Sequence, residues 1–528
     1  MTHYKNPILP GFHPDPSICR ARGRYYLTTS SFEYFPGLPI FESADLVNWR
    51  QIGHVLSRPS QLPLEGARPS SGSCAPTLRH HDCRFYLITT NITHGGNFVV
   101  TATDPAGPWS DPIWLEGADG IDPSLFFDDD GRCYYTGNGN PEKSLYEGHH
   151  TIWMQELDLA AMRLVGERRV IVDGGVDIRT KPIWIEGPHL YKYGGEYYLI
   201  AAEGGTSDQH SVVAFRSRDV WGPYEPGTRN PVLTNRDLDA RRVGAITCTG
   251  HGDLVDGPDG GLWMVLLACR PYPPSEAGDT NMGRETWLVP MRWEDGWPVC
   301  ADASKELRFE YDAPAAAQSA AGENWDIFED AFAAAELAPA WIAFGADARR
   351  RCGDLASRPG FLRLRLSSEE LTTGSAPSFL GVRQRHHAFT ASVDLDFEPG
   401  APGEAAGLAI QQNNRAALSL EVAASAAGRV LRAATREAGQ DRPRIAAETS
   451  LRPGPVRLRL DVQDGECSCR WSQDGAPWML LARLDSRLLS AHHTGGFVGA
   501  LVGPYGTSQG APTQSHADFA HFSYRGER

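Results

Sequence analysis

Short segments of alternating apolar and polar residues run through the whole chain, and one of them shows the pattern most completely. Residues 184–205, WIEGPHLYKYGGEYYLIAAEGG, combine aromatic and branched residues typical of β-strands with a Gly-Gly pair that predicts a hairpin turn. The same pattern of two strands joined by a turn occurs five times, at intervals of 47 to 65 residues. The five copies begin at Asp15, Ala75, Asp122, Gly187 and His251.

A repeated unit of this size cannot bury its own apolar face, so its copies must pack against one another. Five such copies within residues 1–305 predict a five-bladed β-propeller. Further segments between the copies are expected to form the outer strands of the blades. Examples are SADLVNWRQIG, TDPAGPWSDPIWL and SRDVWGPYEPG. Because equivalent positions of the blades face one axis, Asp15, Asp122, Glu186 and His251 are predicted to converge there.

The pattern changes after the fifth copy. Residues 306–324 are rich in Ala, Ser, Gly and Pro and indicate a linker or a crossing between domains. Residues 325–528 return to period-2 alternation, in segments such as GFLRLRLSS, FTASVDLDFE, LSLEVAA and VRLRLDVQ. Half-buried antiparallel strands of this kind predict a β-sandwich that packs against the propeller. The fold class is therefore all-β, with little helix.

Composition narrows the choice of partners and compartment. With 528 residues and a net charge of −15, the chain has no basic excess for binding nucleic acid or an anionic membrane. No signal peptide and no apolar run of about 18 residues is visible, so no membrane association is expected. Ten scattered cysteines without a CxxC pair are typical of thiols in a reducing compartment, which predicts a cytoplasmic protein.

Five motifs in order carry a resemblance to a known family. These are GFHPDPS, GIDPSLFFDDDG, EGPHLYK, GHGDLV, and GRET followed by WEDGWPV. In this order and spacing the chain closely resembles glycoside hydrolase family 43, in particular its two-domain β-xylosidases and α-L-arabinofuranosidases. The resemblance covers nearly the whole chain and implies a five-bladed propeller followed by a β-sandwich.

The resemblance also implies roles for three carboxylates. Asp15 matches the general base that activates water, Asp122 the carboxylate that orients the acid and tunes its pKa, and Glu186 the general acid. Hydrolysis with inversion needs one protonated and one ionised carboxyl group about 6.5–9.5 Å apart, with a water between the base and the sugar. A neighbouring carboxylate raises the pKa of the acid, which gives Asp122 a reason to lie beside Glu186.

Further residues match the sugar pocket of the family. Phe32 matches an aromatic of the pocket, and Arg284 an arginine that reaches substrate hydroxyls; ion pairing of Arg284 with Glu285 or another acid is the alternative. His251 matches an axial histidine near a water or a calcium ion. No cofactor is required, but a structural calcium held mainly through water at His251 is an open alternative, since calcium prefers oxygen ligands. Tyr505 lies in a segment expected to be a loop that reaches the pocket rim.

Four adjacent histidine pairs look like metal ligands, but neighbours on a strand point to opposite faces. They are predicted to be surface or loop residues: His80-His81, His149-His150, His386-His387 and His492-His493.

One departure from the family concerns specificity. Many β-xylosidases of the family have a tryptophan before the Ala-Pro of the second blade, where this chain has Cys74. The predicted activity is exo-acting removal of terminal β-D-xylose from small xylo- or arabinoxylo-oligosaccharides. An α-L-arabinofuranosidase or a dual-activity enzyme is the near alternative, and a non-catalytic carbohydrate-binding propeller is the alternative of another class. A homo-oligomer is compatible with the sequence, which identifies no interface.

Overall fold

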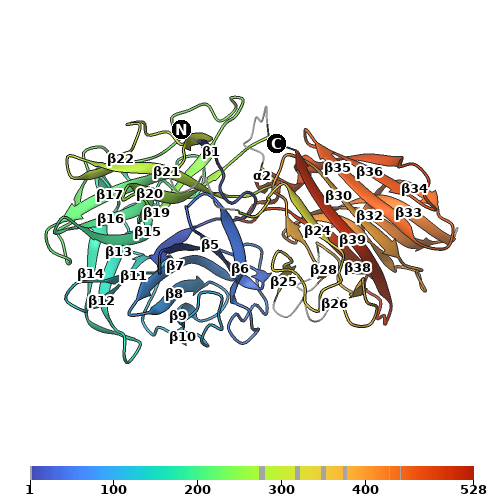
Figure 1. Ribbon diagram of the computed structural model, residues 1–528, viewed down its shortest axis with the longest axis horizontal. Helices are drawn as coiled ribbons and strands as arrows, with labels where there is room; N and C mark the ends of the chain where they lie inside the picture. The colour runs from blue at the N-terminus through green and yellow to red at the C-terminus, as the bar shows by residue number, and fades with distance from the viewer. Residues whose placement is uncertain are drawn as a thin grey trace.

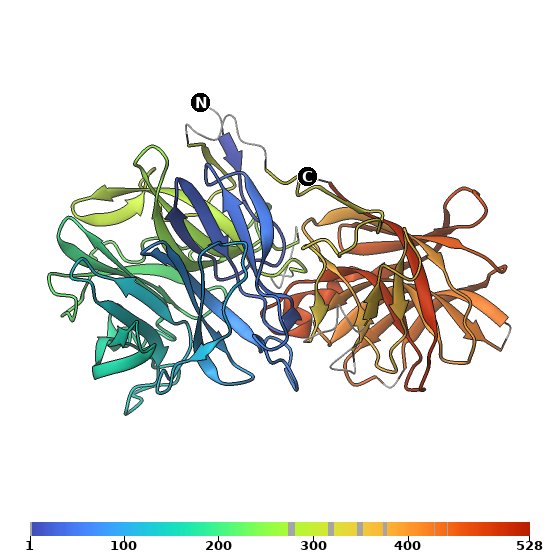
Figure 2. The same cartoon turned by 60° about the horizontal axis from the view of Figure 1, so that its bottom comes forward.

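The computed structural model describes residues 3–272, 280–314, 322–345, 352–372, 377–426, 428–440 and 442–527. Two β-rich bodies lie side by side, with the N-terminal half of the chain in one and the C-terminal part in the other (Figures 1 and 2). Helical segments in these ranges are short and include η1 (Ile178–Thr180), η3 (Ser486–Leu489) and α2 (Ala491–Thr494). The predicted all-β class is confirmed.

Five four-stranded antiparallel sheets form the N-terminal body, one from each sequence repeat. Blade 1 contains β2 (Ser17–Ala21), β3 (Arg24–Thr28), β5 (Gly37–Ser43) and β6 (Trp49–Leu56). Blade 2 contains β7 (Ser73–His81), β8 (Arg84–Asn91), β9 (Gly96–Ala102) and β10 (Ile113–Trp114). Blade 3 contains β11 (Ser124–Phe127), β12 (Cys133–Gly139), β13 (Thr151–Asp158) and β14 (Arg163–Asp173).

The last two blades follow the same order. Blade 4 contains β15 (Glu186–Tyr193), β16 (Glu196–Glu203), β17 (Ser211–Ser217) and β18 (Glu225–Pro226). Blade 5 contains β19 (Thr247–Asp256), β20 (Leu262–Cys269), β21 (Glu285–Glu294) and β22 (Trp297–Cys300). The segments expected to form outer strands contain β10 and β18 and the first five residues of β6, which are the fourth strands of their blades, so this part of the prediction is confirmed.

The first residue of each repeat has the same unusual backbone. All five have a left-handed conformation, with φ between 46° and 58°: Asp15, Ala75, Asp122, Gly187 and His251. Non-glycine residues adopt this region only where the surroundings require it. The shared conformation shows that the five repeats are structurally equivalent within a few residues of the start of each inner strand.

The C-terminal body is a sandwich of two antiparallel sheets. In the first sheet the strands run in the order β26 (Gly353–Asp354), β27 (Leu362–Arg365), β39 (His516–Glu527), β30 (Ala388–Asp396), β35 (Val456–Gln463), β36 (Glu466–Ser472) and β37 (Met479–Asp485), with β24 (Ile327–Asp330) also on β39. The second sheet has the order β28 (Ser378–Phe379), β38 (Leu501–Thr507), β31 (Ala405–Gln412), β32 (Ala416–Ser425), β33 (Gly428–Glu437) and β34 (Arg444–Ser450), with β29 (Val382–Arg383) also on β38.

Burial along these strands follows the predicted alternation only in part. Strands β30 and β35 alternate between buried and more exposed positions, as half-buried strands do. Strands β31 and β32 are instead buried on both faces over eight consecutive residues. Their second face is covered, because Ala409 and Ala417 belong to an apolar cluster that also contains Phe12 and Phe32 of the propeller.

The two bodies are joined by backbone pairing as well as by side chains. Strand β25 (Ala343–Phe344) pairs with β4 (Tyr34–Phe35) of the propeller. The segment expected to be a linker contains β23 (Glu310–Asp312), which pairs with the N-terminal strand β1 (His3–Lys5).

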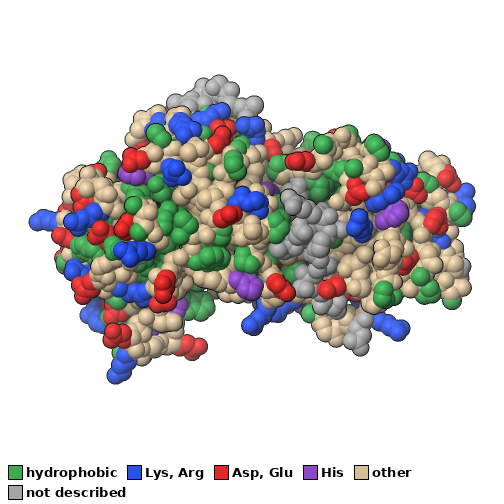
Figure 3. All heavy atoms as spheres, turned by 90° about the horizontal axis from the view of Figure 1, so that it is seen from below, with side chains coloured by type: hydrophobic (Ala, Val, Ile, Leu, Met, Phe, Trp, Pro, Cys, Tyr) green, Lys and Arg blue, Asp and Glu red, His purple; other side chains and the backbone are tan. Residues whose placement is uncertain are grey.

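On the face shown in Figure 3, acidic and basic side chains are interspersed on both bodies.

Candidate active site

A pocket of about 220 Å³ opens at the propeller axis. It is lined by residues from all five blades and one from the sandwich: Asp15, Phe32, Cys74, Ala75, Ile92, Ile121, Asp122, His150, Trp184, Glu186, Thr206, His251, Arg284 and Phe497. Seven of the eight residues predicted for the site are therefore brought together, although their positions span 269 residues of chain.

The three carboxylates come from equivalent places in three blades. Asp15 precedes β2, Asp122 precedes β11, and Glu186 is the first residue of β15. All three side chains are almost completely withdrawn from solvent. Burial disfavours the charged form of a carboxyl group, so the protonation of each one depends on its immediate neighbours.

Asp15 is surrounded by groups that stabilise a negative charge. Ser30 Oγ donates a hydrogen bond to Oδ2 at 2.6 Å, and Arg284 Nη1 donates to Oδ1 at 3.1 Å. His251 Nδ1 lies 3.5 Å from the same Oδ1. Burial alone would raise the pKa of Asp15, but the charges of Arg284 and His251 and the Ser30 hydrogen bond outweigh it and lower the pKa below its ordinary value. Asp15 is therefore ionised at neutral pH.

Glu186 has the opposite environment. Burial raises its pKa well above the ordinary value, and the nearby carboxylates of Asp122 and Asp15 raise it further. The pKa of Asp122 is also raised, mainly by burial, while its Oδ2 accepts a hydrogen bond from the Gly187 N–H at 3.0 Å. This bond ties Asp122 to the backbone of the residue after Glu186, so the two carboxyl groups are held next to one another.

His251 lines the pocket and requires a glycine beside it. A Cβ atom on Gly187 would lie 2.9 Å from the His251 ring, and Gly187 has a φ of 58°. Nearby His189 and His210 are buried imidazoles whose pKa is lowered to about 3, chiefly by burial. They are neutral nitrogen donors, whereas calcium takes six to eight oxygen ligands.

The expectation of calcium therefore finds little direct support in the side chains around His251. Within the described ranges, no group of three or more His, Cys, Asp or Glu residues is arranged to hold a metal ion. Asp15 is the carboxylate in contact with His251, and the neighbouring imidazoles do not fit a hard cation. No chemical step derived below depends on a metal ion.

Arg284 is a donor aimed at both the base candidate and the pocket. Glu285, the alternative partner, instead accepts a hydrogen bond at its Oε2 from Arg270 Nε at 2.6 Å. Arg284 pairs with Asp15, and its Nε has no hydrogen-bond partner among the described residues. Its guanidinium also lies over Phe32 and Phe497, at 5.9 and 5.2 Å from the ring centroids. Arg284 also lines the pocket, and a guanidinium carries several N–H donors that suit sugar hydroxyls.

The contribution of the sandwich differs from the predicted one. Tyr505 is not in a loop; it lies within β38, is fully buried, and accepts a hydrogen bond from Arg436 behind the pocket wall. The sandwich residue that lines the pocket is Phe497, which follows α2 and is held by a hydrogen bond from its N–H to Ser70 Oγ at 2.7 Å. Tyr505 follows turn-like residues in the sequence, but its tertiary position makes it a core residue.

Other lining residues were not predicted from the sequence. They are Ile92, Ile121, His150, Trp184 and Thr206. Trp184 could have been found from the sequence, because it lies two positions before the acid candidate Glu186. The others lie in loops whose sequence carries no pattern of period 2, so only the closed propeller places them at the pocket.

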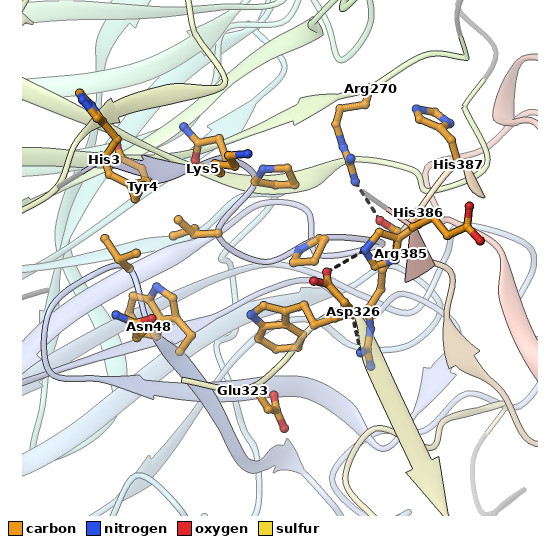
Figure 4. A pocket seen from close by; sticks show the side chains of 18 of the residues that line it. His3, Tyr4, Lys5, Asn48, Arg270, Glu323, Asp326, Arg385, His386 and His387 are labelled. Carbon is orange, nitrogen blue, oxygen red and sulfur yellow. Dashed lines mark hydrogen bonds and ion pairs between the residues drawn. The ribbon is translucent and has the colours of Figure 1, made fainter. Parts of the chain in front are cut away.

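A second and larger hollow of about 900 Å³ lies between the two bodies and shares no residue with the carboxylate pocket. Figure 4 shows Arg270 beside Arg385, and His386 joined to Asp326. The His386 Nε2–Asp326 Oδ1 distance is 3.1 Å, and burial lowers the pKa of His386 to about 4. His386 and His149 lie in loops, in line with the prediction of surface or loop positions, but both side chains are buried, His149 against Asp173.

The pocket has the parts that acid–base cleavage of a glycosidic bond requires. It holds one carboxyl group that burial and negative neighbours keep protonated, and one that cationic neighbours keep ionised. Such a pair can protonate a leaving oxygen and accept a proton from water.

Among the residues that the structure describes, no helix has the length and apolar character of a membrane crossing.

Comparison with known proteins agrees with this chemistry. The family model described as glycosyl hydrolases family 43 matches residues 4–298, and the model described as the beta xylosidase C-terminal concanavalin A-like domain matches residues 329–525. The chain is 40% identical over 529 residues to a xylosidase/arabinosidase of Butyrivibrio fibrisolvens, with 99% of each chain covered. It is 36% identical over 533 residues to the non-reducing end alpha-L-arabinofuranosidase BoGH43B of Bacteroides ovatus, covering 99% of this chain and 94% of the relative.

Solved structures show the same arrangement over the full length. The Bacteroides ovatus xyloglucan PUL GH43B structure superposes with a TM-score of 0.90 at 35% identity and 100% coverage of both chains. The xylan beta-1,4-xylosidase of Bacillus halodurans superposes with a TM-score of 0.89 at 33% identity, covering 99% of this chain and 100% of that one. With both of its domains and its whole length matched, the chain belongs to glycosyl hydrolase family 43 and is a glycosidase.

Proposed function

We propose that this glycosidase is exo-acting and inverting, and that it releases terminal β-D-xylose from xylo-oligosaccharides. The observation that carries the proposal is that two buried carboxyl groups in one small pocket have pKa values shifted in opposite directions. The pKa of Glu186 is raised and that of Asp15 is lowered. The pocket volume of about 220 Å³ favours a single terminal sugar over an internal segment of a chain.

In this proposal Glu186 is the general acid and Asp15 the general base. Protonated Glu186 donates its proton to the glycosidic oxygen as the bond to the anomeric carbon breaks. Ionised Asp15 takes a proton from the water that attacks the opposite face of that carbon, so the anomeric configuration is inverted. Asp122 keeps Glu186 protonated and, through its bond to the Gly187 N–H, holds the acid in position.

The other residues bind the sugar. Arg284 donates a guanidinium N–H to a hydroxyl, while Phe32 and Cys74 form the wall behind the ring. His251 lies beside Asp15, with its Nδ1 3.5 Å from Asp15 Oδ1, and helps to hold that carboxylate in place. Phe497 lines the pocket and contacts the sugar, the role that was expected of Tyr505.

Release of α-L-arabinofuranose is the second candidate activity. Two observations favour it: Cys74 occupies a wall position where a larger side chain is expected in a β-xylosidase, and relatives at 40% and 36% identity are named as a xylosidase/arabinosidase and an arabinofuranosidase. Both sugars are pentoses, so the same three carboxylates can serve either bond.

We also propose a division into a catalytic propeller at residues 1–305, a crossing segment at 306–324 and an accessory sandwich at 325–528. A cytoplasmic location is supported by the cysteines, all ten of which are free thiols and most of which are buried. The substrate would then be a small oligosaccharide that has entered the cell.

Paired initial rates test the substrate. The purified protein is assayed on 4-nitrophenyl β-D-xylopyranoside and 4-nitrophenyl α-L-arabinofuranoside in one buffer. A preference for the xyloside of tenfold or more, about 1.4 kcal/mol in the transition state, supports the xylosidase. A preference for the arabinofuranoside selects the second candidate, and binding of xylobiose without turnover of either substrate would indicate a carbohydrate-binding protein.

The anomer of the first product tests inversion. Proton NMR of 4-nitrophenyl β-D-xylopyranoside hydrolysis, in which all released xylose comes from the cleaved bond, should show α-xylose at early times, before mutarotation. Initial release of β-xylose would contradict the roles assigned to Asp15 and the attacking water.

A further inference from the structure

Trp184 is a large aromatic side chain in an exposed position at the mouth of the pocket. It lies two residues before Glu186, lines the cavity and remains 40% exposed. Most tryptophans of a β-protein are buried for stability, and an exposed ring beside a pocket therefore needs another explanation.

The backbone of Trp184 is held in a conformation that a bulky residue rarely adopts. Its φ is 50°, in the left-handed region, which costs free energy unless the surroundings compensate. The Trp184 N–H donates to the Gly148 carbonyl at 2.9 Å, and the Gly204 N–H donates to the Ile183 carbonyl at 3.0 Å. These two bonds fix the chain on both sides of the tryptophan.

Two glycines leave room for the ring and its neighbour. A Cβ atom on Gly205 would lie 3.0 Å from the Trp184 ring, and one on Gly148 would lie 2.8 Å from Ile183. Gly205 has a φ of 75° and Gly148 one of 80°. Two other loops, one with Gly148 and one with Gly204 and Gly205, are thus shaped around residues 183 and 184, which makes the indole a preorganised surface rather than a freely moving side chain.

The position of this surface relative to Glu186 identifies what it faces. The group that protonates the leaving oxygen lies on the side of the pocket where the leaving group departs. Ile92 of blade 2, 51% exposed, adds a second apolar surface at the same mouth. A sugar that follows the scissile bond would leave the closed pocket between these two side chains.

We propose that Trp184 is the stacking surface for the leaving-group sugar and that it selects substrates in which this sugar is a pyranose. The inference rests on the proposed function and deepens it. The ring face of a xylopyranose carries C–H groups and no exocyclic carbon, so it can lie flat on the indole. The leaving group is a xylopyranose in a xylo-oligosaccharide and in an arabinoxylo-oligosaccharide, so the role is the same whether xylose or arabinofuranose is released.

The test compares leaving groups with and without a ring. Wild type, Trp184→Ala and Trp184→Phe are assayed on xylobiose and on methyl β-D-xylopyranoside, or on the corresponding arabinofuranosides if those are preferred. Trp184→Ala should lower kcat/KM for xylobiose about tenfold or more, mainly through KM, and change the methyl glycoside less than about twofold. Trp184→Phe should restore most of the loss, because an aromatic face is retained.

Ile183→Ala is the matched control, since Ile183 is an exposed apolar neighbour that does not line the pocket. It should leave both substrates close to wild type. Equal losses on both substrates in Trp184→Ala, or the same loss in Ile183→Ala, would overturn the proposal by showing a structural role. Failure of the wild-type protein to hydrolyse either substrate would instead contradict the proposed function itself.

Discussion

Residue type alone does not set the chemistry of the carboxyl groups in this pocket. Asp15 and Glu186 are buried to a similar extent, so both pay a similar desolvation cost when ionised. Arg284, His251 and Ser30 surround Asp15, whereas Glu186 has Asp122 and Asp15 as its charged neighbours. Their pKa values therefore move in opposite directions, and the pair divides into a base and an acid.

Replacement of the acid should depend on the leaving group. Glu186→Ala should lower kcat for xylobiose by about 10²- to 10⁴-fold, because the leaving sugar oxygen needs a proton. The loss should be much smaller for 4-nitrophenyl glycosides, whose leaving group is stable as an anion. Asp15→Ala is the matched control and should damage both substrates alike. Similar losses in Glu186→Ala on both substrates would remove the residue from the role of acid.

The pH profile of kcat/KM should reflect the same two groups. Activity requires Asp15 ionised and Glu186 protonated, so the acid limb should fall below the ordinary Asp range and the alkaline limb well above the ordinary Glu value of about 4.3. In Glu186→Ala, assayed on the 4-nitrophenyl glycoside, the alkaline limb should disappear while the acid limb remains. An unchanged alkaline limb would assign it to another group.

A further buried carboxyl group should limit stability at alkaline pH. Burial raises the pKa of Glu33 to about 8, and its Oε1 has no partner among the described residues. The folded state therefore holds a proton that the unfolded state loses above about pH 4.3, so stability falls as pH rises from there to about 8.

Glu33→Gln removes this titration and keeps the shape of the side chain. Its thermal midpoint should match that of the wild type near pH 4 and exceed it increasingly up to about pH 8, by as much as a few kcal/mol in stability. A constant difference in thermal midpoint between the two proteins from pH 4 to pH 8 would show that Glu33 does not titrate as described.

At the scale of elements, a residue with left-handed backbone lies near the start of the inner strand of each blade. The left-handed conformation recurs at all five repeat starts, and this regularity explains why the sequence pattern located the carboxylates correctly. The loop position expected for Tyr505 came from the resemblance to related two-domain enzymes and not from this repeat. In the structure, Gly503 and Gly506 beside it leave room for Leu380 and Leu366 of the same sandwich, and a sequence pattern cannot distinguish this use of glycine from a turn.

The segment after α2 should matter for binding. Phe497 is 42% exposed, lines the pocket and lies near Arg284, so removing its ring should weaken sugar binding without opening the core. Phe497→Ala should lower kcat/KM about tenfold while the thermal midpoint stays within about 2 °C. Leu480→Ala, an equally exposed apolar residue of the sandwich away from the pocket, should leave activity unchanged. An equal loss in both variants would indicate a general effect on the sandwich.

At the scale of the whole molecule, one buried ion pair links four of the five blades. Asp253 of blade 5 accepts hydrogen bonds from Ser17 Oγ at 2.7 Å and from Arg79 Nη1 at 2.9 Å, and also from the Tyr191 hydroxyl. Arg79 in turn donates to His189 Nδ1 at 3.0 Å. Removing one partner of such a pair leaves a buried charge uncompensated.

Asp253→Asn should therefore destabilise the propeller by about 3–5 kcal/mol, measured from thermal or urea unfolding. The double variant Asp253→Asn, Arg79→Met should be less destabilised than the two single changes added together. Glu466→Ala, which removes an exposed pair with Arg483, serves as a control and should cost less than about 1 kcal/mol. A small effect of Asp253→Asn would show that the blades close without this pair.

The sequence by itself determined the fold class, the number of blades and the three carboxylates that meet at the axis. These follow from period-2 patterns and from a repeated turn, which are local properties that recur along the chain. The boundaries proposed between the two domains remain a prediction from composition.

The tertiary structure alone decided which side chains complete the pocket and how each carboxyl group titrates. Phe497 and Phe32 meet although they are separated by more than 400 residues, and the double-sided burial of β32 arises from contact with the propeller. The difference between Asp15 and Glu186 has the same origin, because Arg284 and Asp122 come from other blades. Such properties depend on distances between remote segments, and no local pattern in the sequence encodes those distances.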